Sequence, residues 1–179
     1  MPYPDLQRRA LFGATAASAL LFAGGTRGVA AAPGPNPVGF AFEITRSDAE
    51  WKEMLTEAEY KILREGGTEN PETSPLWQEK RAGIYCCRGC DLTLYESGWK
   101  APVDKGWVFF YHAEPNSVLT GIDPFVEEYG QTPEGRSFVN IMEVHCRRCS
   151  SHLGHILNVE GEPLHCINGS SLVFRPDAA

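Results

Sequence analysis

Five of the six cysteines fall into two short groups, and their spacing suits metal binding. Cys87 and Cys90 form one Cys-x-x-Cys pair, and Cys146 and Cys149 form a second pair after 55 intervening residues. A gap of two residues lets both sulfurs of a pair reach one ion, so two pairs predict a tetrahedral zinc site. Four sulfur ligands leave no open position for substrate, so this zinc is expected to be structural. A redox-active Cys-x-x-Cys pair and a set of disulfides are the alternatives.

Cys166 stands alone in an apolar, strand-like segment, with His165 before it and Asn168 two residues after it. Such a cysteine is either a small buried hydrophobic residue or a nucleophile. His152 and His155 follow the second cysteine pair, and an imidazole near a thiol can lower its pKa or deliver a proton. The sequence therefore contains the components of a second, reactive site. If disulfides form, Cys86 is the thiol left over to pair with Cys166.

The N-terminus has the pattern of an export signal. Arg8 and Arg9 precede a short run rich in Ala and Gly, which ends in small residues before Pro33. We interpret residues 1–32 as a twin-arginine signal peptide and expect a periplasmic protein. The alternative is an amphipathic helix or a membrane anchor. Residues 33–41, with three prolines in their first five positions, are predicted to form an extended linker.

The composition restricts the class of protein. The 179 residues are 42% hydrophobic and 22% charged, which excludes a disordered, collagen-like or coiled-coil chain. The formal net charge of −7 argues against a protein that holds nucleic acid through phosphate contacts. No apolar stretch long enough to span a membrane follows the N-terminal segment, so we expect no membrane insertion of the mature chain.

Helices and strands are segregated along the mature chain. Ser47 with Glu50 and Thr56 with Glu59 are capping boxes, which predict helices over 48–54 and 57–65, the second ending at Gly66. Short apolar or alternating runs then predict strands near 84–85, 92–95, 107–111, 138–144, 155–157 and 172–174. This order predicts an α+β fold with antiparallel sheets. Residues 111–135 are expected to form a long acidic loop, either a lid or a docking surface.

Several motifs in this order resemble the methionine-R-sulfoxide reductase family. They are the two cysteine pairs, Gly-Trp at 106–107, Glu-Val at 143–144, His-Leu-Gly-His at 152–155 and Cys-Ile-Asn at 166–168. The resemblance spans residues 42–176, the predicted catalytic domain. It implies two antiparallel sheets in a tent-like arrangement, with structural zinc distant from the active cysteine.

The resemblance also implies roles for individual residues. Cys166 matches the nucleophile, whose thiolate attacks the sulfoxide sulfur, releases methionine and remains as a sulfenic acid. His152, His155 and Asn168 match residues that hold the oxygen and water. Trp107 matches the wall against which the substrate methyl packs, and Phe110 is expected to line the same wall. The zinc ligands match Cys87, Cys90, Cys146 and Cys149.

The chain also departs from the family pattern. Lys105 stands where many members keep a recycling cysteine, so regeneration needs an external thiol, from a thioredoxin-like protein or a small molecule, or Cys86 if it lies within reach. Leu164 replaces a common arginine, which removes a cation that would favour the thiolate. Val108 and Phe109 alter the pocket rim after Trp107.

Three functional hypotheses follow. The first is a periplasmic enzyme that repairs oxidised methionine, free or in proteins, using Cys166. The second is a non-catalytic, zinc-stabilised binding module of the same fold, which the departures favour. A thiol peroxidase that uses Cys166 with Cys86 is the third. Cys166 retained together with His152, His155 and Asn168 favours the reductase.

Overall fold

A computed structural model describes residues 40–122 and 142–178 of the chain. The predicted signal peptide, residues 1–32, lies outside the described residues, and so do residues 33–39 of the predicted linker. Residues 123–135 of the predicted acidic loop and the start of the strand predicted at 138–144 also lie outside them. Within the described part of the chain, no helix is long and apolar enough to cross a membrane.

Both predicted helices are confirmed, with the predicted bounds. Helix α1 (Asp48–Met54) begins at the Ser47 capping box, where the Glu50 carboxylate accepts the Ser47 backbone N–H at 2.7 Å. Helix α2 (Glu57–Glu65) begins at the equivalent box of Thr56 and Glu59. It ends at Gly66, whose φ of 73° gives the left-handed turn that a glycine adopts at little cost.

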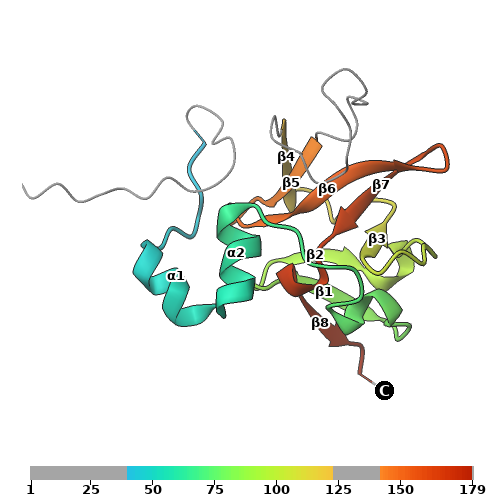
Figure 1. Ribbon diagram of the computed structural model, residues 1–179, viewed down its shortest axis with the longest axis horizontal. Coiled ribbons are helices and arrows are strands. Elements are labelled where there is room, and N and C mark those ends of the chain that lie inside the picture. The colour runs from blue at the N-terminus through green and yellow to red at the C-terminus, as the bar shows by residue number, and fades with distance from the viewer. Residues whose placement is uncertain (1–39, 123–141, 179) are drawn as a thin grey trace, which may run out of the picture.

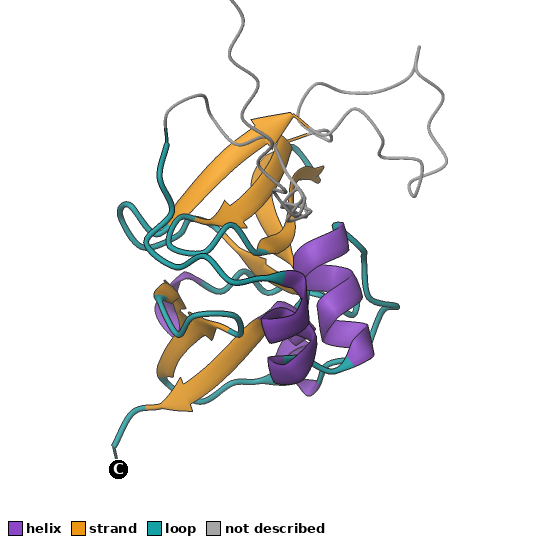
Figure 2. Ribbon diagram, turned by 90° about the vertical axis from the view of Figure 1, so that its left-hand side faces the viewer, coloured by secondary structure: helices purple, strands orange, loops and turns teal. Residues whose placement is uncertain are grey.

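The strands form two antiparallel sheets, which confirms the predicted α+β class. A three-stranded sheet has the order β2-β1-β8, and a five-stranded sheet has the order β3-β7-β6-β5-β4. Figure 2 shows the two sheets one above the other, with both helices on the same side of them. The bounds are β1 (Gly83–Cys87), β2 (Thr93–Glu96), β3 (Val108–Phe110), β4 (Val118–Ile122), β5 (Met142–Cys146), β6 (His152–Val159), β7 (Glu162–Ile167) and β8 (Leu172–Pro176) (Figure 1).

Strand β4 corrects the prediction of one continuous loop over 111–135. Residues Val118–Ile122 pair with β5 along their whole length and form the edge of the five-stranded sheet. Thr120 and Ile122 are exposed, the other three residues are half-buried, and none of the five is fully buried. The strand was missed because its five residues do not alternate strictly between apolar and polar types.

Two apolar clusters stabilise this arrangement. The main cluster packs helix residues Trp51 and Leu63 against both sheets, with Tyr85 and Phe110 fully buried at its centre. The second, smaller cluster lies on the other face of the five-stranded sheet and contains Ala101, Phe109, Leu164 and Cys166. The two clusters use alternate residues of β3 and β7, because successive side chains of a strand point to opposite faces.

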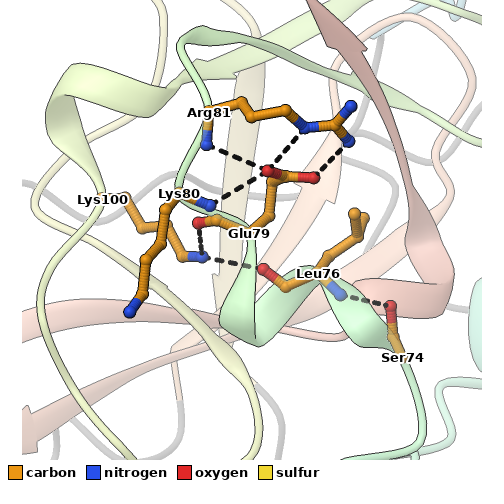
Figure 3. Close-up of polar contacts among 6 residues, drawn as sticks. All are labelled: Ser74, Leu76, Glu79, Lys80, Arg81 and Lys100. Atoms are coloured by element: carbon orange, nitrogen blue, oxygen red, sulfur yellow. Dashed lines mark hydrogen bonds and ion pairs between the residues drawn. The ribbon is translucent and has the colours of Figure 1, made fainter.

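A long connection, residues 66–82, carries the chain from α2 to β1 and is fixed by Lys100. The Lys100 ammonium donates to the backbone carbonyls of Leu76, Trp77 and Glu79, at 2.8, 2.9 and 2.7 Å. These carbonyls belong to the short 3₁₀ helix Pro75–Gln78 and its C-terminal cap, Glu79, whose backbone N–H also donates to the Leu76 carbonyl. In Figure 3, the Glu79 carboxylate also accepts from Lys80 and Arg81. The connection is thereby held in one conformation.

Candidate functional site

The two cysteine pairs come together between the sheets. Cys87 ends β1 of the three-stranded sheet, and Cys146 ends β5 of the five-stranded sheet. The Sγ atoms of Cys87 and Cys149 are 3.7 Å apart, and those of Cys90 and Cys146 are 3.4 Å apart. All four sulfurs lie within 4.8 Å of one another and could hold one metal ion. Four thiolates around a tetrahedral ion with bonds of about 2.3 Å are separated by about 3.8 Å, so the donor set fits zinc.

Each pair is shaped by the same local turn. Asp91 follows Cys90 with a φ of 63°, and Ser150 follows Cys149 with a φ of 60°. The backbone N–H of Asp91 donates to the Cys87 carbonyl, and that of Ser150 donates to the Cys146 carbonyl. The two turns therefore repeat one conformation. All six cysteines are free thiols, so the disulfide alternative does not describe this structure.

Arg64 supplies positive charge next to the four thiols. Its guanidinium is buried and donates to the Cys149 carbonyl at 3.1 Å, while it lies 4.4 Å from the centre of the Trp51 ring. Burial lowers the pKa of Arg64, and the nearby Cys149 and Cys87 sulfurs oppose that shift. Hydrogen bonds from the neighbouring thiols, led by Cys146, lower the pKa of Cys149. The same interactions raise the pKa of Cys87 and Cys146, so within this cluster Cys149 is the sulfur most readily deprotonated to the form that binds metal.

Cys166 lies in a different setting, in a row of side chains across the five-stranded sheet. Phe109 of β3 is directly opposite Cys166 of β7, Cys166 is opposite His155 of β6, and His155 is opposite Glu143 of β5. Residues directly opposite each other on antiparallel strands project from the same face. The register therefore gathers a thiol, an imidazole, a carboxylate and an aromatic ring on one face.

The environment of Cys166 is apolar. The thiol is 6% exposed and packs in the second cluster, which Trp107 joins as a half-buried neighbour. Burial, helped by the negative charge of Glu69, raises the pKa of Cys166 to about 12. The thiol is therefore protonated at neutral pH, and its conversion to a thiolate requires a proton acceptor or a bound substrate.

Two features of the His-Leu-Gly-His segment bring its histidines to Cys166. A Cβ atom at Gly154 would lie 2.1 Å from the Cys166 carbonyl oxygen, so only glycine allows β6 to approach β7 this closely. The register shifts beside Leu153, with Val144 opposite Gly154 and His145 opposite His152. Because Leu153 is the extra residue of this bulge, His152 returns to the face of His155. The two imidazole centres are 5.3 Å apart.

Glu69 connects two more of the predicted site residues. Its backbone N–H donates to the Asn168 side-chain oxygen at 3.0 Å, and its carbonyl accepts the indole N–H of Trp107 at 3.1 Å. Its buried carboxylate accepts from the backbone N–H groups of Gly169 and Ser170, at 2.6 and 2.9 Å. The connection from α2 therefore fixes Trp107, Asn168 and the turn after Cys166 in relation to one another.

Glu143 holds the first histidine of the segment. Its carboxylate lies 2.5 Å from Nδ1 of His152 and 3.5 Å from Nε2 of His145. Burial raises the pKa of Glu143, but the hydrogen bond from His152 and the charges of the surrounding histidines outweigh it, so the pKa is lower than usual. A buried, ionised carboxylate thus orients His152.

Three residues that the sequence analysis mentions with Cys166 lie elsewhere: Phe110, expected on the same wall, His165, which precedes Cys166, and Cys86, a conditional recycling thiol. Phe110 is fully buried in the main cluster, where it stacks on Tyr95 at 4.2 Å, because it points to the opposite face from Phe109. His165 also points away from Cys166, toward the Tyr95 hydroxyl at 3.1 Å, and burial lowers its pKa to about 4. Cys86 lies on β1 of the other sheet, with its sulfur 3.9 Å from the Thr93 hydroxyl.

Sequence analysis did not assign two residues, Glu69 and His145, to this site. Phe109 entered only as an altered residue of the pocket rim, and Glu143 entered only as part of a motif. Their contacts depend on strand register and on a connection of 17 residues, neither of which leaves a local pattern. The signal that could have found Glu143 and His145 is their spacing, because positions i and i+2 of a strand share a face.

Comparison with known proteins places this geometry in a family. A SelR domain matches residues 55–176. The chain is 36% identical over 138 residues to the peptide methionine sulfoxide reductase MsrB of Agrobacterium fabrum, covering 75% of this chain and 94% of that protein. It is 39% identical over 131 residues to the MsrB of Cellvibrio japonicus, covering 72% and 86% of the two chains. The MsrB of Methanosarcina barkeri is 35% identical over 138 residues, covering 75% and 89%.

Proposed function

The chain belongs to the SelR family of peptide methionine sulfoxide reductases, and from this premise we propose that it reduces the R epimer of methionine sulfoxide with Cys166. It is an oxidoreductase that acts on methionine sulfoxide. The single observation that carries the assignment of Cys166 is its place opposite His155, on a sheet face bounded by Phe109 and Trp107. An apolar wall, a thiol and an imidazole are what the substrate methyl, sulfur and oxygen require.

The proposed reaction transfers the sulfoxide oxygen to Cys166. The Cys166 sulfur attacks the substrate sulfur and forms a sulfur–sulfur bond. The sulfur–oxygen bond of the substrate then breaks, the oxygen bonds to the Cys166 sulfur and the sulfur–sulfur bond breaks, which leaves a sulfenic acid on Cys166. The thiol proton balances the charge that develops on the oxygen. Methionine is released with two electrons more than the sulfoxide had, and those electrons come from the Cys166 sulfur.

His155 is proposed to carry the proton. The Cys166 thiol is protonated at rest, since its pKa is about 12, so deprotonation must accompany attack. His155 projects beside Cys166 from the neighbouring strand, and His152 lies against His155 in an orientation set by Glu143. Asn168 is held through its amide by the Leu153 carbonyl and the Glu69 backbone, and it contributes to the same polar side.

Trp107 and Phe109 are proposed to form the wall for the substrate methyl. Trp107 packs on the Cys166 cluster, and its indole is fixed by the Glu69 carbonyl. Phe109 takes the part that the sequence assigned to Phe110, because it shares the face of Cys166. Aromatic rings make favourable contacts with sulfur-bearing groups, so this wall suits a methionine side chain.

We infer that an external thiol regenerates Cys166. The sulfenic acid condenses with one thiol to form a mixed disulfide and water, and a second thiol then releases Cys166. Lys105 stands where a recycling cysteine is common, and Cys86 lies on the other sheet. The reductant is therefore a thioredoxin-like protein or a small thiol.

We infer that the four-cysteine site holds zinc. Cys87, Cys90, Cys146 and Cys149 would be its ligands, and the separations of their sulfurs and the adjacent guanidinium of Arg64 support this donor set. Zinc bound by four sulfurs supplies no catalysis here but ties the ends of β1 and β5 together.

We infer export from the sequence before the domain. Residues 1–32 have the twin-arginine pattern, and residues 33–41 are interpreted as a linker to the domain at 42–176. Twin-arginine transport carries folded proteins, so the metal can be loaded before the thiols meet an oxidant. The reductase would then repair methionine in the periplasm.

The test is turnover with the separate R and S epimers of a blocked methionine sulfoxide and excess dithiothreitol. We expect consumption of the R epimer alone. Consumption of the S epimer instead would contradict the stereochemical assignment. If the folded, zinc-loaded protein consumes neither epimer, it is a binding module, and peroxide consumption without sulfoxide reduction would identify a thiol peroxidase.

A further inference from the structure

A second group of metal-binding side chains lies inside the five-stranded sheet, separate from the four cysteines. Glu143 and His145 are two residues apart on β5, and His152 begins the neighbouring strand β6. Each offers one ligand atom, and the three atoms lie within 4.8 Å of one another. Glu143, His145 and His152 are 6%, 4% and 0% exposed. The three donors are therefore held close together and shielded from solvent.

The donor set has the chemistry of a known class of metal site. Two imidazoles and one carboxylate bind zinc in several enzymes, and imidazole also suits cobalt, nickel, copper and iron. Oε2 of Glu143 and Nε2 of His145 are 3.5 Å apart. Two ligands of a tetrahedral zinc ion, with bonds of about 2.0–2.1 Å, are separated by about 3.3 Å. This pair already has the spacing that an ion requires.

The hydrogen bond between His152 and Glu143 leaves the other ring nitrogen of His152 without a partner. Nδ1 of His152 meets Oε1 of Glu143 at 2.5 Å, but Nε2 of His152 is buried and has no hydrogen-bond partner among the described residues. A buried polar nitrogen without a partner is unfavourable, and an ion can supply that partner. An ion shared with Glu143 replaces the hydrogen bond between Nδ1 and Oε1, because one ion cannot lie beside both Nε2 and the carboxylate while that bond holds. One carboxylate also compensates part of a divalent charge, as in other sites of this composition.

We propose that Glu143, His145 and His152 bind one divalent transition-metal ion, in addition to the ion of the four-cysteine site. The ion is of the kind that prefers nitrogen and oxygen ligands, such as Zn²⁺ or Co²⁺. Three protein ligands leave a position open, unlike the four-sulfur site. Because His152 lies against His155, which is opposite Cys166, the ion lies on the sheet face of Cys166 and occupies His152 while it is bound.

The test uses the full chain, first brought to one zinc per chain as checked by metal analysis and then dialysed against Co²⁺. Zinc binds more tightly than cobalt, so it keeps the thiolate site. We expect one zinc and one cobalt per chain, with weak visible bands and no thiolate-to-cobalt charge-transfer band. The measurement counts metal and does not depend on reductase activity, so its outcome is independent of the proposed function.

His145→Asn is the test variant, and His112→Asn is the matched control because His112 is exposed and lies outside the group. We expect His145→Asn to retain zinc and lose cobalt, and His112→Asn to retain both. The proposal is overturned if the wild type binds no cobalt, if the cobalt shows thiolate bands, or if His145→Asn still binds it. Should His145→Asn fail to fold, cobalt-induced broadening of wild-type imidazole NMR signals decides: His145 and His152 must broaden, and His112 must not.

Discussion

The two cysteine sites of this protein are built in opposite ways. The four-cysteine site arises from two copies of one local turn, each set by a two-residue gap and a left-handed residue after the second cysteine. The Cys166 site arises from register, since Phe109, Cys166, His155 and Glu143 come from four different strands. The first site depends on short-range sequence and supports the fold. The second depends on the whole sheet being in place, and it is the site where we propose that the chemistry occurs.

The largest expected effect follows from breaking the first site. Cys149→Ser removes one sulfur of the four, and we expect loss of the metal and unfolding of the domain, because metal binding in such a site is part of the folding free energy. Metal content and thermal unfolding measure this. Cys86→Ser is the control, since Cys86 is equally buried beside Cys87 but lies outside the ligand set. A folded, metal-free Cys149→Ser protein would contradict the structural role.

Breaking the second site should remove activity without affecting the fold. We expect Cys166→Ser to lower kcat by at least about a thousand-fold, as the loss of a nucleophile does in other enzymes. Metal content should stay at the wild-type level, because Cys166 is not near the four sulfurs in the sheet order. Steady-state reduction of methionine-R-sulfoxide and a metal assay check both statements. Residual activity above that level would mean that another group attacks the sulfoxide.

The contrast between these variants shows what the sequence could predict. The helices were predicted with their bounds, because the capping boxes at Ser47 and Thr56 are local sequence patterns. The cluster of four cysteines was predicted from their spacing alone. Phe110 was placed beside Cys166, but a shift of one residue in β3 moves a side chain to the other face, and Phe109 is there instead. Glu69 could not be found, because its contacts join residues about 100 positions apart.

The two sites should also differ in their response to pH. Burial raises the pKa of Cys166 from 9.0 to about 12, so the folded protein keeps the thiol protonated where an unfolded chain would not. The resulting stabilisation is complete below pH 9 and is lost as the pH rises from about 9 to 12. Iodoacetamide should alkylate Cys166 in the native protein about a thousand-fold more slowly than an ordinary thiol at pH 8.

Mass spectrometry of the Cys166 peptide at pH 7 to 10.5 gives the alkylation rate, with the urea-unfolded protein as reference. Unfolding of the Cys166→Ser variant tests the effect on stability. Its free energy of unfolding should fall less between about pH 9 and 12 than that of the wild type, because only other groups still titrate. A native rate that levels off near pH 7 would show that a thiolate exists at rest and would contradict a protonated thiol.

Glu69→Gln tests whether the connection of residues 66–82 positions the Cys166 site. The substitution keeps the shape but weakens the acceptor for Gly169, Ser170 and the Ser170 hydroxyl, which hydrogen bonds at 2.5 Å. We expect a loss of about 1–3 kcal/mol in stability, as for a buried hydrogen bond to a charged group. We expect kcat/KM to fall about ten-fold, because Trp107 and Asn168 lose their common support.

Glu72→Gln is the matched control for Glu69→Gln, since Glu72 lies on the same connection but is exposed. Denaturant unfolding and steady-state kinetics on both variants give the comparison. If the two variants behave alike, Glu69 does not position the site.

The smallest effect is expected at the aromatic wall. Trp107→Phe keeps an apolar ring but loses the indole N–H that donates to the Glu69 carbonyl. Loss of one such hydrogen bond is worth about 0.5–1.5 kcal/mol, which corresponds to a change of roughly two- to ten-fold. We expect this change mainly in KM for the sulfoxide, with zinc content unaltered. An unchanged KM would place the substrate methyl elsewhere.

The central claim is that Cys166 reacts with the sulfoxide while the four-cysteine site only binds metal. A single turnover without reductant tests this claim most directly. One equivalent of methionine-R-sulfoxide is mixed with the metal-loaded protein, and dimedone then traps any sulfenic acid for peptide mass spectrometry. We predict one methionine formed per chain and one trapped group, on Cys166 alone, with the metal retained. Trapped oxygen on Cys87, Cys90, Cys146 or Cys149, or methionine formed with Cys166 unmodified, would contradict it.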